Sequence, residues 1–113
     1  MTNMAYNVII TPQAQQRLDM YIGYTLHVLK NKQAAKAIRD DAIATKRELA
    51  VVAPTLRYCE NPVLKKLGYR KIVFRKHDFL MLYRIEDDKI IVDGMYHQLQ
   101  DYESIFANDM NLD

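Results

Sequence analysis

The feature that most constrains the fold of this chain is a series of three short β-type segments in its second half. In the first, residues 69–75, successive side chains are expected to point to opposite faces of a strand. One face would carry Tyr69, Lys71, Val73 and Arg75, and the other Arg70, Ile72 and Phe74. The second, residues 79–85, is almost continuously apolar, which is typical of a central strand covered on both faces. An acidic turn at 86–88 precedes the third, residues 89–95. The short connections predict a three-stranded antiparallel meander.

Two amphipathic helices are predicted before the meander. Thr11 is a suitable N-cap and Pro12 is suited to the first helical position, so a helix is expected from Pro12 to about Leu29. Asn31 follows as a candidate cap for a second helix, which Pro54 ends. The second helix carries a regular seam at spacings of three and four, formed by Ala35, Ile38, Ala42, Thr45, Leu49 and Val52. The two helices should form an antiparallel hairpin, because small residues in the seam allow close approach.

The remaining segments complete an α+β order. Residues 6–10 are rich in β-formers and predict a first strand, residues 55–67 are interpreted as a loop, and residues 101–107 as one or two turns of helix. The helical hairpin must bury its seam, and the sheet is the surface available for that. We therefore expect a single domain over residues 1–113, with one small sheet and the hairpin as two layers.

Composition excludes several classes of protein. No apolar run approaches the length of a membrane span, and the N-terminus lacks the features of a signal peptide, so a cytoplasmic protein without a membrane partner is expected. The single Cys59 excludes an internal disulfide and is interpreted as a small loop residue. Phosphate-binding and dinucleotide-binding motifs are absent, as is any metal-ligand spacing, so neither a cofactor nor a metal is expected.

Charge is distributed unevenly along the chain. Residues 57–84 carry eight Lys or Arg and two acidic residues, whereas residues 85–113 carry one basic and eight acidic residues. One interpretation is that the acidic end solvates the chain and partly neutralises the basic strands. The other is a basic groove that binds something anionic, and the asymmetry favours this one.

The candidate functional residues cluster around the meander. We expect His97, Arg75 and Tyr102 to be the catalytic residues, and the expected contacts to nucleic acid or another target are Arg70, Lys76, Arg84 and Gln100. Cleavage of RNA by its own 2′-hydroxyl requires an acid, a base and cations on the scissile phosphate. Histidine suits the first two tasks, and arginine the third.

Each candidate also has a structural interpretation. His97 could be a strand-end histidine bonded to the backbone, and Arg84 could form a salt bridge with Glu86 or an acidic residue of the tail. Tyr102 could close the core, and His77 is interpreted as a solvent-exposed turn residue.

From Tyr6 onward the chain resembles the RelE/ParE superfamily of toxins of bacterial type II toxin–antitoxin systems, also called plasmid-stabilisation proteins. The resemblance rests on the opening VIITPQAQQRLDMYIGY, the Ala-rich second helix AAKAIRDDAIATKREL, the Gly-Tyr-Arg entry at 68–70, and the hairpin LMLYRIEDDKIIVDGMYH closed by QDY. It implies a small antiparallel sheet packed on a helical hairpin, in a growth-arresting toxin neutralised by a partly disordered antitoxin.

The resemblance leaves three functions open. RelE-like members cleave mRNA on the ribosome, whereas ParE-like members inhibit DNA gyrase without catalysis; a non-toxic relative that only binds an antitoxin is the third. The exit from His97 to Tyr102 and the basic middle segment favour the nuclease, and the apolar segment Phe79–Tyr83 and the long helical hairpin favour the gyrase inhibitor. Of the three, the function expected from the sequence is ribosome-dependent mRNA cleavage, with the other two as alternatives. The expected partners are a cognate antitoxin and either the ribosome with mRNA or DNA gyrase, and a homodimer or toxin–antitoxin hetero-oligomer is compatible with the sequence.

Overall fold

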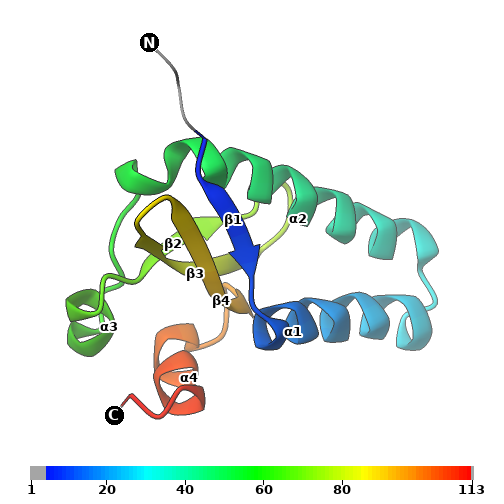
Figure 1. The fold of residues 1–113 in the computed structure, drawn as a ribbon. Coiled ribbons are helices and arrows are strands. Elements are labelled where there is room, and N and C mark those ends of the chain that lie inside the picture. Colours follow the sequence, from blue (N-terminus) through cyan, green and yellow to red (C-terminus); the bar gives the residue numbers. More distant parts are fainter. Residues whose placement is uncertain (1–4, 113) are drawn as a thin grey trace.

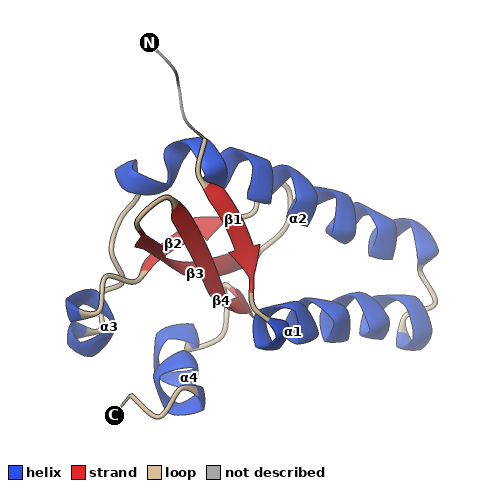
Figure 2. Cartoon of the chain, in the orientation of Figure 1, coloured by secondary structure: helices blue, strands red, loops and turns tan. Residues whose placement is uncertain are grey.

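The computed structural model describes residues 5–112 and has a mixed sheet with helices on both faces (Figure 1). The strands are β1 (Asn7–Ile10), β2 (Arg70–Val73), β3 (Phe79–Glu86) and β4 (Lys89–His97). The helices are α1 (Pro12–Gly23) with its π-helical continuation η1 (Tyr24–Val28), α2 (Lys32–Val52) with the 3₁₀ turn η2 (Ala53–Thr55), α3 (Pro62–Lys66) and α4 (Tyr102–Asp109). This order of elements confirms the predicted α+β fold (Figure 2).

The sheet has the strand order β1-β4-β3-β2. Strands β2, β3 and β4 form the predicted antiparallel meander. Strand β1 pairs in parallel with β4, with Asn7 opposite Lys89, so the sheet as a whole is mixed. The two long strands β3 and β4 occupy the centre, as the apolar segment 79–85 predicted.

A β-bulge interrupts the pairing of β3 with β4. Leu82 lies opposite Gly94 and Tyr83 opposite Val92, so Asp93 is the extra residue on β4. Val92 and Met95 therefore both reach the core beneath the helical hairpin, although strict alternation would place them on opposite faces.

Each face of the sheet has its own hydrophobic cluster. The helical hairpin covers one face, and the seam of α2 is buried there as predicted: Ala35, Ile38, Ala42, Thr45 and Leu49. The opposite face packs against α4 and α3 through a second cluster, which includes Cys59, Leu64, Tyr69, Leu80, Leu82, Tyr96 and Phe106. The sheet and hairpin thus form the two expected layers, and short helices close the other side (Figure 1).

Local signals explain most of the helix ends. The hydroxyl of Thr11 accepts a hydrogen bond from the amide of Ala14, and the side chain of Asn31 accepts one from Ala34, as N-caps do. Helix α3 was missed, because the segment 55–67 was interpreted as a loop, yet Asn61 caps it and Pro62 occupies its first turn. No helix within residues 5–112 is long and apolar enough to cross a bilayer.

Candidate functional site

His97 ends β4 with its ring held on both sides. Its Nδ1 accepts a hydrogen bond from the amide of Leu99 at 3.1 Å, which requires that this nitrogen be unprotonated. The ring meets that of Phe79 edge to face, with 5.2 Å between centroids. His97 therefore has the backbone-bonded arrangement that was the structural alternative for it.

Gln100 joins the exit of β4 to the helical hairpin. Its Oε1 accepts hydrogen bonds from the amide of His97 and from the hydroxyl of Tyr21 on α1, each at 3.0 Å. The ring of Tyr21 in turn packs on Phe79 at 4.8 Å. The carbonyl oxygen of Gln100 is thus used within the fold.

Tyr102 lies in a contact between α4 and β2. Its hydroxyl accepts a hydrogen bond from Lys71 Nζ at 2.9 Å, and the same ammonium lies 3.5 Å from Glu103. The carboxylate of Glu103 also accepts from the amides of Glu60 and Asn61, at the start of α3. These contacts hold α3 and α4 together.

Arg70 binds the segment that follows α2. Its guanidinium donates to the carbonyls of Pro54 and Leu56, at 3.1 and 2.7 Å, and to the hydroxyl of Tyr58 at 2.7 Å. It also stacks on the Tyr58 ring at 4.0 Å. Arg70 therefore holds the connection between α2 and β2.

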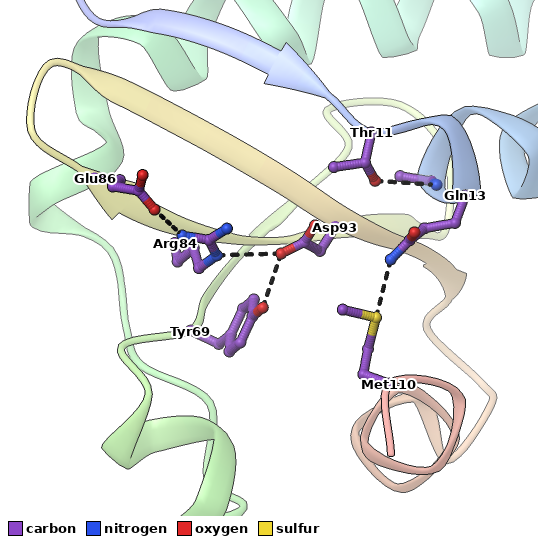
Figure 3. A network of polar contacts seen from close by, with 8 residues as sticks. Thr11, Gln13, Tyr69, Arg84, Glu86, Asp93 and Met110 are labelled. Carbon is purple, nitrogen blue, oxygen red and sulfur yellow. Dashed lines mark hydrogen bonds and ion pairs between the residues drawn. The ribbon is translucent and has the colours of Figure 1, made fainter. Parts of the chain in front are cut away.

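Arg84 belongs to a polar network around the bulged residue Asp93 (Figure 3). Its Nε lies 3.3 Å from Asp93 Oδ2, and a further nitrogen pairs with Glu86, as the structural alternative predicted. The Tyr69 hydroxyl donates to the same Asp93 oxygen at 2.8 Å. Burial, followed by this bond to a carboxylate, raises the pKa of Tyr69 to about 12.

Arg75 and Lys76 lie in the loop between β2 and β3, which is attached to α2 by Asp41. The carboxylate of Asp41 accepts from the amides of Arg75 and Lys76, at 3.2 and 2.9 Å, and lies 2.7 Å from His77 Nδ1. The interpretation of His77 as a solvent-exposed turn residue was wrong, because its ring is half-buried against this carboxylate. The side chains of Arg75 and Lys76 themselves are exposed.

The protonation of Asp41 is set by this arrangement. Burial acts to raise its pKa, but the hydrogen bonds from His77 and from the two amides outweigh burial and lower the pKa below its usual 3.8. A carboxyl whose folded pKa is depressed stabilises the fold fully above its unfolded pKa, and the effect is lost as the pH falls through the folded value. The stabilising contribution of Asp41 is therefore fully present at neutral pH and is lost only in acid.

The structure brings only part of the candidate set together. The exit of β4 lies beside the loop between β2 and β3, since the amide of Gln98 donates to the carbonyl of Asp78 at 2.7 Å. His97, Gln100, Arg75 and Lys76 therefore share one end of the sheet. Phe79 lies opposite His97 and Tyr83 lies opposite Arg70, so Arg70 is displaced by about 13 Å along β3.

A model of the family described as the ParE toxin of type II toxin–antitoxin systems matches residues 8–102. The chain belongs to the ParE toxin family. Among solved structures, it is similar to a chain of the chromosomal ParDE toxin–antitoxin system from P. aeruginosa, with a TM-score of 0.67 at 20% sequence identity. That match covers 82% of this chain and 96% of the other, and it shows a shared fold. No curated protein matches the sequence.

Two buried carboxylates of this ParE-family chain escaped prediction. Asp41 lies on the flank of the α2 seam, one residue before Ala42, so a carboxylate at the edge of an apolar stripe was the signal that could have shown it. Asp93 lies within a strand segment where an acidic residue needs a partner. Within residues 5–112, His, Cys, Asp and Glu side chains do not gather in a group that could hold a metal ion.

Cys59 is expected to be unreactive in the folded ParE-family protein. It is 1% exposed in the second cluster, and burial, with a contribution from the charge of Glu103, raises the pKa of its thiol to about 12. Because only the thiolate attacks, a thiol reagent at pH 8 should label the native protein at least about 100-fold more slowly than the protein unfolded in guanidinium. Equal rates in the two states would contradict the buried position of Cys59.

Proposed function

We propose that this ParE-family protein is the toxin of a toxin–antitoxin module and inhibits DNA gyrase by binding, without catalysing a reaction. The observation that carries the proposal is the match of the ParE toxin family over residues 8–102. It replaces the sequence-based preference for ribosome-dependent mRNA cleavage with the second of the three functions that the resemblance implies.

The contacts of the candidate residues support a binding function. A nuclease needs an acid, a base and a cation on one phosphate. In this chain the guanidinium of Arg70 holds three oxygens of the fold, Arg84 is paired with Asp93 and Glu86, and the hydroxyl of Tyr102 is paired with Lys71. The side-chain oxygen of Gln100 also accepts two hydrogen bonds within the fold, so four of the seven candidates already serve the structure.

Arg75 and Lys76 are the candidates best placed to contact a partner. Both are exposed, and they project from a loop whose backbone is fixed on α2. We propose that the exposed side chains of this loop form the target-binding surface. A cognate antitoxin is the second proposed partner, since the similar P. aeruginosa chain comes from a ParDE toxin–antitoxin system.

One observation favours the mRNA nuclease as a second candidate. His97 and Gln100 lie at the same end of the sheet as the loop that carries Arg75 and Lys76. The two functions differ in what they require of His97, because a nuclease would need its imidazole for proton transfer.

His97→Ala is therefore expected to keep the protein toxic. Expressed without antitoxin, the variant should arrest growth at an inducer concentration within about threefold of the wild type, as is normal for removal of a half-exposed side chain outside the chemistry. Leu99→Ala, which alters an 87% exposed side chain in the same exit, is the matched control. A folded His97→Ala protein that has lost its toxicity would favour the nuclease.

Incorporation of labelled precursors after induction tests the proposal in cells. A gyrase inhibitor should reduce thymidine incorporation before methionine incorporation. An immediate fall in methionine incorporation alone would contradict the proposal and support the nuclease. If both continue and growth is normal, the chain is the third kind of protein, a non-toxic relative that binds an antitoxin.

A further inference from the structure

We propose that Asp41 is a positioning residue, whose buried carboxylate holds the loop between β2 and β3 in the conformation that presents Arg75 and Lys76 to an anionic surface of the target. The inference rests on the proposed function in one respect, namely that this toxin acts through a binding surface that includes the loop. It goes further in assigning a role to a residue on α2 that lies behind the surface.

The geometry of the carboxylate supports a positioning role. The Asp41 side chain is only 1% exposed, and it receives donors from three successive residues of the loop, two through backbone amides and one through an imidazole. A single side chain on a helix thereby fixes the backbone of residues 75–77. Hydrogen bonds to an ionised acceptor are about twice as strong as neutral ones, so the attachment is firm.

The direction of the side chains completes the arrangement. The donors of the loop point inward to Asp41. The side chain of Arg75, by contrast, is exposed, and its ion pair with Glu48 is long at 4.0 Å. Lys76 is likewise exposed. An exposed loop without this attachment would have to be ordered when the target binds, at a cost in conformational entropy for each ordered residue. Asp41 removes that cost by ordering the loop in advance.

The closing experiment compares Asp41→Asn with Asp40→Asn. Both substitutions remove one negative charge from neighbouring positions of α2, but Asp40 is exposed and paired with Lys36. In Asp41→Asn, hydrogen exchange at the amides of Arg75 and Lys76 should become about 10- to 100-fold faster, because a charge-assisted acceptor is lost. Unchanged exchange at these amides would overturn the proposed attachment.

Toxicity provides the readout that a merely structural role would not produce. For Asp41→Asn, the inducer concentration needed to halve the growth rate should be about tenfold higher than for the wild type. For Asp40→Asn this concentration should be unchanged. In a protein that already carries Arg75→Ala and Lys76→Ala, adding Asp41→Asn should cause no further loss, since Asp41 acts through those two side chains. An equal loss in both backgrounds, or full toxicity of Asp41→Asn despite a loosened loop, would overturn the proposal.

His77→Ala keeps the test decisive if Asp41→Asn fails to fold. It removes the imidazole donor and leaves both amide donors in place, so exchange and toxicity should change in the same direction by a smaller factor. No change in either would contradict the proposal. The growth assay detects toxicity whatever the target is, whereas a gyrase assay detects it only if gyrase is the target. A wild-type protein that arrests growth while gyrase stays fully active would reject the proposed function, and loss of toxicity in this series would still support the role of Asp41.

Discussion

Replacing Phe106 by Ala is expected to lower the free energy of unfolding by about 3–5 kcal/mol. Phe106 is 1% exposed on α4, and its ring lies edge to face with Tyr69 at 5.0 Å and with Tyr96 at 6.3 Å. A Cβ placed on Gly94 would lie 3.0 Å from the Phe106 ring, so this ring also fills the space above the glycine. Removing it leaves a cavity on the face of the sheet that α4 covers.

The fall in melting temperature should be large, because a given loss of stability shifts the melting temperature more in a small domain than in a large one. A domain of this size has a total stability of roughly 5–15 kcal/mol, and 1 kcal/mol corresponds to about 4–8 °C in melting temperature. Thermal unfolding followed by circular dichroism should therefore show a fall of at least about 12 °C for Phe106→Ala. Leu99→Ala is the control, since it truncates an apolar side chain that is 87% exposed. Similar small shifts for both variants would contradict the packing of α4 on the sheet.

Replacing Asp93 by Ala should cost about 3 kcal/mol, the second largest effect expected. Asp93 is 7% exposed, and its loss leaves the Tyr69 hydroxyl without its acceptor and Arg84 with Glu86 as its remaining carboxylate. Removal of one partner from a buried ion pair costs roughly 3–5 kcal/mol, and the partial exposure of Arg84 places this case at the lower end.

Two further variants separate the parts of that effect. Glu86→Ala removes the exposed partner of Arg84 and should cost less than about 1 kcal/mol, as surface pairs do. Asp93→Asn keeps an oxygen for the Tyr69 hydroxyl but removes the charge, so its stability should lie between those of the wild type and Asp93→Ala. Urea unfolding measures all three, and an Asp93→Ala protein as stable as Glu86→Ala would contradict the network in Figure 3.

The parts of the fold that could be predicted are those with local signals. The seam of α2 and the alternation of residues 69–75 follow from periodicity, and the caps Thr11 and Asn31 follow from residue type. The parallel pairing of β1 with β4 was not predicted, because it joins the two ends of the chain and has no signal within either segment. The short helix α3 was missed because Asn61-Pro62 serves equally well as a turn or as a helix start.

The candidate site was harder to predict than the fold. Sequence shows which side chains could do chemistry, but it does not show which are already bonded within the structure. Arg70 and Arg84 were chosen for their charge, yet their partners lie on other elements. Asp41 illustrates the reverse, because its three donors lie 34–36 residues further along the chain and appear only once the loop between β2 and β3 packs on α2.

The central claim is tested most directly by supercoiling of relaxed plasmid DNA with purified gyrase and the purified chain. The account expects the wild type and His97→Ala to inhibit supercoiling to the same extent, and Arg75→Ala/Lys76→Ala to inhibit at least about tenfold more weakly, since two charged contacts are lost. Cognate antitoxin should restore supercoiling. Full gyrase activity in the presence of a toxic wild-type protein, together with cleavage of mRNA on ribosomes that His97→Ala abolishes, would contradict the account.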